Sequence, residues 1–245
     1  TAPHPDDLEI IMGGTIAKLG DQGYRVGMLH MTNGEPTPRG NPETRAQESA
    51  AAAEILGAAH CQTLDLPNRE LMDCPQARYK VATVLRRHKP KILVGMYGRT
   101  PAASPDHYQA QLITEAARFY SQLTKWDDRF DGTEPHRIDH LVYRPSRLGA
   151  EVAHFHSQFV VDITQTIDRK LRAVGCYKSQ FEGERAERVL QYVRAGAASE
   201  GMSAGFGFGE TYALPRPPGI TDMVAMLGDW AVPPPFDPQS PPASP

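Results

Sequence analysis

The sequence has few cysteines, no long apolar run and no excess of basic residues, and each absence excludes a class of protein. No apolar run approaches the roughly 20 residues that would span a bilayer, and no basic and then apolar leader precedes the first motif. The 3 cysteines, Cys61, Cys74 and Cys176, are widely spaced and form no CxxC pair, so neither a disulfide framework nor a thiolate zinc site is indicated. We expect a soluble, cytoplasmic protein whose cysteines are buried small side chains.

Neither sign of charge dominates the chain. The 26 lysines and arginines nearly balance the 29 aspartates and glutamates, which leaves a formal net charge of -3. Nothing therefore draws the protein to nucleic acid or to an anionic membrane, and we expect a small polar molecule as its partner. A nucleotide-binding enzyme of the Rossmann type is a weak alternative, because the glycines near Gly13 form no GxGxxG string.

Helical and strand patterns alternate along the chain. Helical patterns cover residues 8–19, 43–56, 75–88, 107–123 and 183–200. Thr164 is expected to cap one more helix, which runs to about residue 180. Short apolar runs predict buried strands at residues 25–31, 61–66, 91–97 and 158–163.

This alternation predicts an α/β fold. Because the strands are apolar along their whole length, we expect a Rossmann-like, mostly parallel sheet with helices on both faces. A chain of 245 residues is long enough for a single domain, which we place at residues 1–230. The proline-rich residues 231–245 predict a disordered tail.

A first cluster of polar residues lies at the start of the chain. His4, Asp6 and Asp7 fall within four positions, ahead of the Gly13-Gly14 pair, and imidazole with carboxylate suits a divalent metal such as zinc. The alternative is a helix-capping turn in which an aspartate is the cap and His4 is incidental. The motif also leaves no room for a preceding strand, although a doubly wound sheet normally delivers such a loop from a central strand.

A second cluster, Ser104-Pro105-Asp106-His107, follows the strand at residues 91–97 and opens a helix. This order places it at the same carboxyl edge of the sheet as the first cluster. A hydrolytic zinc site needs three protein ligands and an open position for water, and His4, Asp7 and His107 could supply the ligands. Asp6 would then stand beside the water as a general base.

At these residues the chain resembles the LmbE-like or PIG-L-type zinc deacetylases, which remove acetyl groups from N-acetylglucosamine units in varied conjugates. The resemblance covers most of the chain, in the family's order and spacing. Its strings are His4-Pro5-Asp6-Asp7-Leu8-Glu9, Gly13-Gly14-Thr15-Ile16-Ala17-Lys18, Thr32-Asn33-Gly34-Glu35, Arg45 with Glu48, Leu64-Asp65-Leu66-Pro67 and Pro105-Asp106-His107.

The resemblance implies the same roles for the site residues. His4, Asp7 and His107 would hold Zn2+, with Fe2+ as the alternative metal, and Asp6 would be the general base. The implied enzyme releases acetate and a free amine from an amino-sugar conjugate. Similar proteins form trimers or hexamers, so a homo-oligomer is expected.

Strings in the second half of the chain resemble one branch of the family. That branch deacetylates N-acetylglucosaminyl-malate in bacillithiol synthesis. The strings are Phe159-Val160-Val161-Asp162-Ile163-Thr164, Lys170-Leu171, Tyr177-Lys178-Ser179-Gln180-Phe181 and Gly209-Glu210.

The chain departs from the family pattern at Ser104, a catalytic position. The family usually has a histidine there, in an HPDH string, which stabilises the oxyanion or protonates the leaving group. Loss of one oxyanion donor costs about 100- to 1000-fold in rate, so the alternative function is a metal-binding, catalytically weakened homologue that binds a ligand. Arg99, or His154 or His156 from a later loop, is a hypothetical replacement for the imidazole.

Other residues of the candidate site have both functional and structural explanations. Asp106 joins the catalytic set as a group that orients the metal-binding histidines. Asn68 stands where the family commonly has an aspartate that meets a sugar hydroxyl. Arg45 is a candidate for substrate binding, but a helix-surface ion pair with Glu48 would also explain it.

The glutamates near the two clusters are equally open to two explanations. Glu35 is a candidate for substrate binding, together with Arg99. Glu35 and Glu9 could instead cap the loop and the helix in which they lie.

Overall fold

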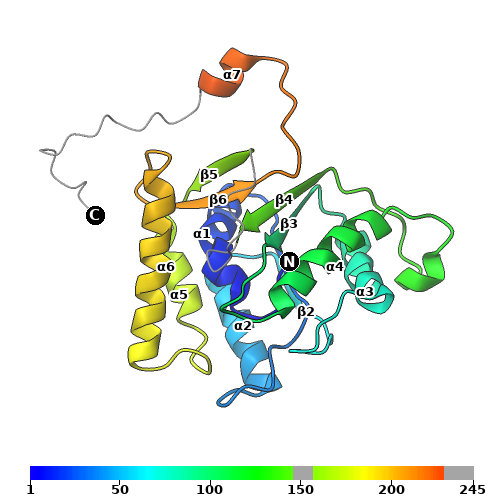
Figure 1. Ribbon diagram of the computed structural model, residues 1–245, viewed down its shortest axis with the longest axis horizontal. Coiled ribbons are helices and arrows are strands. Elements are labelled where there is room, and N and C mark those ends of the chain that lie inside the picture. The colour runs from blue at the N-terminus through cyan, green and yellow to red at the C-terminus, as the bar shows by residue number, and fades with distance from the viewer. Residues whose placement is uncertain (146–156, 229–245) are drawn as a thin grey trace, which may run out of the picture.

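The computed structural model describes residues 1–145 and 157–228, and its elements alternate as the sequence predicts (Figure 1). The helices are α1 (Asp7–Asp21), α2 (Pro42–Leu56), α3 (Pro75–His88), α4 (Asp106–Tyr120), the 3-10 helix η1 (Asp127–Phe130), α5 (Ile167–Val174), α6 (Glu184–Met202) and α7 (Met223–Gly228). The strands are β1 (Gly27–His30), β2 (His60–Thr63), β3 (Ile92–Tyr97), β4 (His140–Pro145), β5 (Gln158–Asp162) and β6 (Gly209–Ala213).

The strands form two sheets, the parallel pair β1-β2 and a four-stranded sheet in the order β3-β4-β6-β5 that is antiparallel at one edge. β1 pairs with β2 and β3 pairs with β4, both in parallel. β6 lies between β4 and β5 and runs antiparallel to both. The predicted single-domain α/β fold is confirmed, and the sheet is mixed. The tail predicted at residues 231–245 lies outside the described residues.

The first two residues of the chain lie between β1 and β3 and join these two sheets into one. Ala2 forms a parallel bridge with His30, and its amide donates to the carbonyl of Leu29 at 3.1 Å. On the other side, the nitrogen of Thr1 donates to the carbonyl of Val94 at 2.7 Å. Thr1 and Ala2 therefore lie at the position of a central strand, and the loop with His4 follows them at its carboxyl end.

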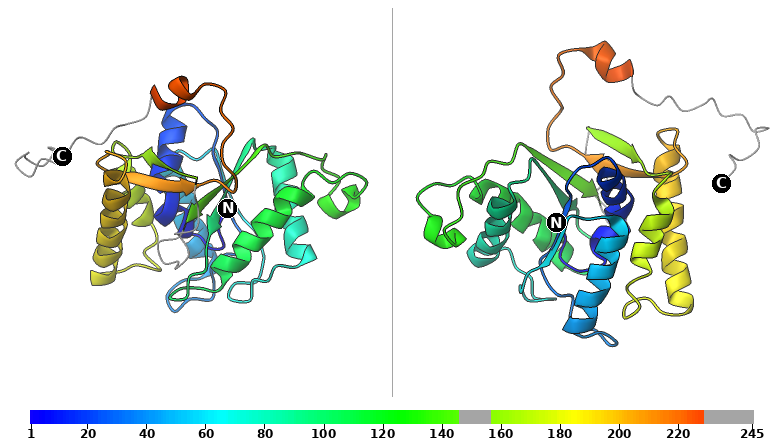
Figure 2. Two further views of the ribbon diagram at one scale, coloured as in Figure 1. Left: turned by 45° about the horizontal axis from the view of Figure 1, so that its top comes forward. Right: turned by 180° about the vertical axis from the view of Figure 1, so that it is seen from behind.

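Two apolar cores lie on opposite faces of the sheet, because successive side chains of a strand point to opposite sides. Met28 packs with α1, α2 and Met96 in one core, whereas the next residue, Leu29, packs with α3, α4 and Leu93 in the other. Figure 2 shows α5 and α6 on one side of the sheet and α3 and α4 on the other. The expectation of helices on both faces is therefore confirmed.

The structure corrects several boundaries. The helix expected from Thr164 begins at Ile167 and ends at Val174, because Thr164 instead donates through its amide and its hydroxyl to the carboxylate of Asp162. Strands β4 and β6 were not predicted. Cys61 is exposed and the other two cysteines are half-buried, so the expectation that they are buried was wrong.

Within residues 1–145 and 157–228, no helix has both the length and the apolar composition needed to cross a membrane.

Candidate metal centre

The loop at His4 leads into α1 through a strained residue. Asp6 has φ of 102°, a value that residues other than glycine rarely adopt and that persists where the surroundings enforce it. Its carboxylate makes no capping hydrogen bond to α1. The carboxylate of Asp7 accepts a hydrogen bond from the backbone amide of His4 at 3.1 Å. The helix-cap explanation is therefore not supported for Asp6, and Asp7 stabilises the turn rather than the helix.

His4, Asp7 and His107 converge at the carboxyl edge of the sheet. Nδ1 of His4 lies 3.1 Å from Oδ2 of Asp7, and Nε2 of His107 lies 3.4 Å from Oδ1 of Asp7. The candidate ligand atoms of all three residues lie within 4.8 Å of one another. In a tetrahedral zinc site with bonds of about 2.0 to 2.1 Å, neighbouring ligand atoms are about 3.3 Å apart. The donor set and its spacing thus fit a zinc ion.

Each histidine is oriented by a partner on its other ring nitrogen. Nε2 of His4 lies 3.2 Å from Oδ2 of Asp106, and Nδ1 of His107 lies 2.8 Å from the hydroxyl oxygen of Thr100. The backbone amide of Arg69 donates to the same Asp106 oxygen at 2.7 Å. Such partners fix the ring orientation of metal-binding histidines. Asp106, which is 1 % exposed, therefore lies behind His4 as a positioning residue.

The pKa of His4 reflects these partners. Burial alone would lower it, but the hydrogen bonds to Asp106 and Asp7 outweigh burial and raise the pKa of His4 to about 10. In the metal-free protein His4 therefore carries a proton at neutral pH. A metal ion has to displace this proton, because only the neutral imidazole is a ligand.

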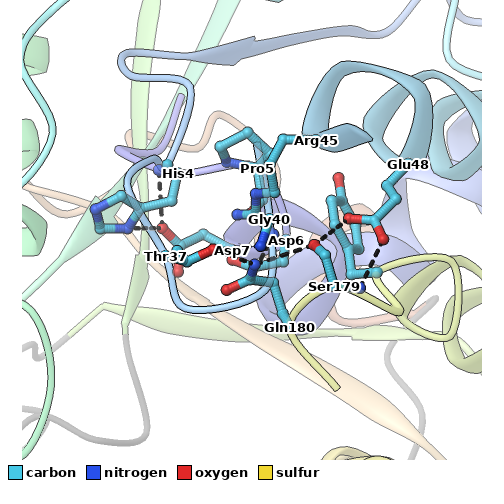
Figure 3. Close-up of polar contacts among 12 residues, drawn as sticks. His4, Pro5, Asp6, Asp7, Thr37, Gly40, Arg45, Glu48, Ser179 and Gln180 are labelled. Carbon is cyan, nitrogen blue, oxygen red and sulfur yellow. Dashed lines mark hydrogen bonds and ion pairs between the residues drawn. The ribbon is translucent and has the colours of Figure 1, made fainter. Parts of the chain in front are cut away.

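Arg45 is buried against the loop and faces Asp6 (Figure 3). Its guanidinium donates to the carbonyl of Pro5, and Nη1 lies 3.5 Å from Oδ2 of Asp6. Burial, followed by the charge of Asp7, raises the pKa of Asp6 to about 7, against the opposing effect of Arg45. A carboxylate whose pKa lies near the working pH is suited to act as a general base.

The surface ion pair between Arg45 and Glu48 is not formed, so that explanation of Arg45 was wrong. Glu48 instead accepts hydrogen bonds from the amide and the hydroxyl of Ser179, at 2.7 and 2.6 Å. Figure 3 shows Glu48 directed toward Ser179 and away from His4. Glu48 therefore ties α2 to the segment that follows α5.

The other two glutamates also accept hydrogen bonds from hydroxyl groups of the chain. Glu35 accepts hydrogen bonds from the amide and the hydroxyl of Thr37, and its Oε1 lies 3.9 Å from Nε of Arg45. Glu9 is fully buried and accepts a hydrogen bond from the hydroxyl of Tyr177 at 2.6 Å. Glu35 thus stabilises its loop close to Asp6, while Glu9 lies in the interior.

Ser104 stabilises the start of α4. Its Oγ accepts a hydrogen bond from the amide of Asp106 at 3.2 Å, which leaves the hydroxyl proton able to donate elsewhere. Arg99 is exposed, and its guanidinium lies 4.9 Å from the ring centre of Tyr108. His154 and His156 lie outside the described residues. The replacement hypothesis for these two histidines therefore stays untested.

Asn68 precedes Arg69, whose backbone amide donates a hydrogen bond to Asp106. Its side-chain oxygen is buried and has no hydrogen-bond partner among the described residues. A buried acceptor without a partner is costly.

A cleft opens beside Asp7 and His107. Apolar side chains of α1, β3 and α6 line much of it. The charged residues Arg144, Lys170 and Glu200 lie at the same cleft, and the sequence analysis did not identify them as members of the site. Only Arg144 has a signal in the sequence, as a charged residue directly after the apolar run Leu141-Val142-Tyr143.

Comparisons with known proteins agree with this geometry. The family model of the GlcNAc-PI de-N-acetylases, PIG-L, matches residues 1–118, which include all candidate ligands. The chain is 32% identical over 218 residues to the diacetylchitobiose deacetylase of Thermococcus kodakarensis, an alignment that covers 85% of this chain and 79% of that protein.

Two further similarities bear on fold and function. The chain is 25% identical over 230 residues to the 4-oxalmesaconate hydratase of Pseudomonas putida, covering 86% of this chain and 81% of that protein. The crystal structure of the conserved protein TT1542 from Thermus thermophilus matches with a TM-score of 0.75 and 32% identity, covering 90% of this chain and 94% of that one.

The first prediction concerns Asp106. Because Asp106 orients His4, we expect Asp106→Asn to weaken Zn2+ binding by about 10- to 100-fold, as measured by competition with a coloured chelator. The control is Asp65→Asn, since the side chain of Asp65 is 82% exposed and pairs with Lys80 at the surface. Equal Zn2+ affinity in the two variants would show that Asp106 does not support the metal ligands.

Proposed function

Because the chain belongs to the PIG-L family of de-N-acetylases, we propose that it is a metal-dependent hydrolase that removes the N-acetyl group from an N-acetylglucosamine-containing conjugate. One observation carries this proposal. His4, Asp7 and His107 converge beside Asp6, and Asp6 is not among the three candidate ligands. Two histidines, a carboxylate and a free base are the parts that hydrolysis of an amide at a zinc site requires.

A bound Zn2+ would polarise the acetyl carbonyl and lower the pKa of a water molecule to about 7. The protein's own residues manage the proton. Asp6, with its pKa near 7, takes a proton from the attacking water and returns it to the leaving amine. Arg45 holds Asp6 in place from behind, and acetate and a free amine are released.

The proposed substrate class follows from the relatives. The Thermococcus protein is named for diacetylchitobiose, a compound with N-acetylglucosamine units. The narrower assignment to N-acetylglucosaminyl-malate rests on sequence strings between residues 159 and 210 alone, and the relatives described above carry other names. N-acetylglucosamine conjugates are therefore the class to test, with the malate conjugate as one member.

The second candidate function, a weakened metal-binding homologue, is favoured by one observation. Ser104 stands at the position where the family usually has histidine, and its oxygen already accepts a hydrogen bond from the amide of Asp106. The name of the Pseudomonas relative adds hydration of an unsaturated acid as a reaction to include in the assays.

The second prediction tests the proposed function. We expect acetate release from N,N′-diacetylchitobiose, N-acetylglucosaminyl-malate or a simple N-acetylglucosamine glycoside in the presence of Zn2+ or Fe2+. A chelator should abolish the release, and added metal should restore it. Absence of acetate from the whole panel, with metal shown to be bound, would favour the second candidate function. Hydration of 4-oxalmesaconate without acetate release would replace the proposal with a hydratase.

The third prediction concerns Ser104. If its hydroxyl donates to the oxyanion, Ser104→Ala should lower kcat by up to about 100-fold, and Ser104→His should raise kcat above that of the unmodified protein. Both variants lose the hydrogen bond to the amide of Asp106, so each is a control for the other in thermal stability. A Ser104→Ala protein with unchanged kcat would restrict Ser104 to stabilising α4.

The fourth prediction separates two roles for Arg45. Because Arg45 is buried and contacts Pro5 and Asp6, we expect Arg45→Met to lower kcat by about 100-fold while KM changes little. A residue that binds substrate would instead show a raised KM. Arg39→Met is the matched control, because Arg39 is exposed in the neighbouring loop and pairs with Glu182. A rise in KM alone would return Arg45 to substrate binding.

A further inference from the structure

Helix α1, which carries Asp7, is broken close to its start. Met12 has φ of −139° and ψ of 17°, values that are not helical, so two helical segments meet at this residue. A break of this kind leaves carbonyls of the first segment and amides of the second without helical partners. Because these groups are buried, other parts of the chain have to satisfy them.

Side chains from two strands bind the broken ends. The carbonyl of Ile11 accepts a hydrogen bond from Nε of Arg144, in β4, at 2.6 Å. The amides of Gly14 and Thr15 donate to the two carboxylate oxygens of Glu210, in β6, at 3.0 and 2.8 Å. A carboxylate at the amino end of a helical segment is also favoured by the helix dipole.

The hydroxyl of Thr166, the residue before α5, binds the second segment just after the break. It donates to the carbonyl of Gly14 at 2.8 Å. Gly14 permits the close approach of this region, since a Cβ atom there would lie 2.6 Å from Cδ1 of Ile163. The break is thus held on both sides by residues that are distant in the sequence.

The charges in this network are balanced and almost fully buried. Nζ of Lys170 lies 2.5 Å from Oε1 of Glu210, and a guanidinium nitrogen of Arg144 lies 3.0 Å from Oε1 of Glu200. Lys170 is 2% exposed and Glu210 is fully buried. Apolar side chains of similar volume often stabilise a core at least as well as a buried ion pair does. A geometric role therefore explains this network better than stability alone.

The network meets the candidate metal centre in the first turn of α1. Asp7 and Ile11 are four residues apart, about one helical turn, and the carbonyl of Ile11 is held by Arg144. Asp7, Ile11, Arg144 and Lys170 line the same cleft. A shift of the break would therefore rotate the turn from which the Asp7 carboxylate projects.

We propose that Glu210, Lys170, Arg144 and Thr166 form a positioning network that sets the direction of Asp7 by holding the break in α1. The proposal rests on the proposed function, because it takes Asp7 as a metal ligand. These residues are not metal ligands in this proposal. They act through the backbone of α1, and their effect is read in the affinity for metal.

The experiment measures Zn2+ affinity by chelator competition, alongside the thermal unfolding of each metal-free protein. Glu210→Gln should weaken Zn2+ binding by about 10- to 100-fold, as is typical when support of a metal ligand is lost. Thr166→Val removes one uncharged hydrogen bond at the same break and should weaken binding less, by about 3- to 10-fold, which is below the range typical for loss of a metal ligand's direct support. This second variant keeps the test decisive if Glu210→Gln does not fold.

The matched control is Arg86→Met. Arg86 is also fully buried, donates to the carbonyls of Ser121, Leu123 and Thr133, and lies over the ring of Phe130. His107 lies at the start of α4 and Ser121 directly follows its end. At a rise of 1.5 Å per residue, the two residues are about 20 Å apart along the helix axis. Arg86→Met should therefore lower the unfolding temperature without changing Zn2+ affinity by more than about twofold.

Each outcome decides the proposal. Weaker Zn2+ binding in Glu210→Gln and Thr166→Val, with unchanged binding in Arg86→Met, supports the network. Unchanged binding in folded Glu210→Gln, unchanged binding in Thr166→Val where Glu210→Gln does not fold, or an equal loss in Arg86→Met overturns it while leaving the proposed function intact. An unmodified protein that binds no Zn2+ would overturn the proposed function and, with it, the role of the network.

Discussion

The carboxylate of Asp7 joins the two histidines of the candidate metal centre. One of its oxygens lies 3.1 Å from the ring of His4 and the other lies 3.4 Å from the ring of His107. His4 comes from the loop that leaves the middle of the sheet, whereas His107 comes from α4, after β3. The position of Asp7 therefore decides whether two separate parts of the chain form one site, and everything that fixes the first turn of α1 contributes to that site.

The environments of the two neighbouring aspartates give them different properties. Burial opposes the ionisation of Asp7, but the charge and hydrogen bond of His107, aided by His4, hold its pKa well below the usual range. Burial and the charge of Asp7 raise the pKa of Asp6 to about 7. The two adjacent carboxylates thus differ in how readily they take up a proton, which suits the proposed roles of Asp7 as metal ligand and Asp6 as general base.

Much of the fold and the core of the candidate site could be predicted from the sequence, because their signals are local. The boundaries of α3 agree with its helical pattern, and His4, Asp7 and His107 converge because both of their segments follow the carboxyl ends of neighbouring strands. Strand β6 was missed because its sequence, GETYA, is short and contains Glu210. Nothing local shows that Lys170 neutralises this glutamate.

Arg45 illustrates the same limit at the site. Its spacing from Glu48 is that of an ion pair on a helix surface, and the pattern of α2 alone gives no reason to prefer another partner. The structure turns Arg45 inward to Pro5 and Asp6, and Glu48 toward Ser179. Partners that are far apart in the sequence are decided by packing, and packing is not encoded by spacing within one helix.

The groups around the metal ligands, rather than the ligands themselves, are the ones that can select the reaction. A relative that is 25% identical bears the name of a hydratase, while a relative that is 32% identical bears that of a deacetylase. A metal ion supplies a charge that serves either reaction, because both have to activate water and stabilise an oxyanion. The choice between the two reactions then depends on which group takes and returns the proton, and here the candidates are Asp6 and its partner Arg45. It also depends on the hydrogen-bond donor that faces the oxyanion, and here the candidate is residue 104.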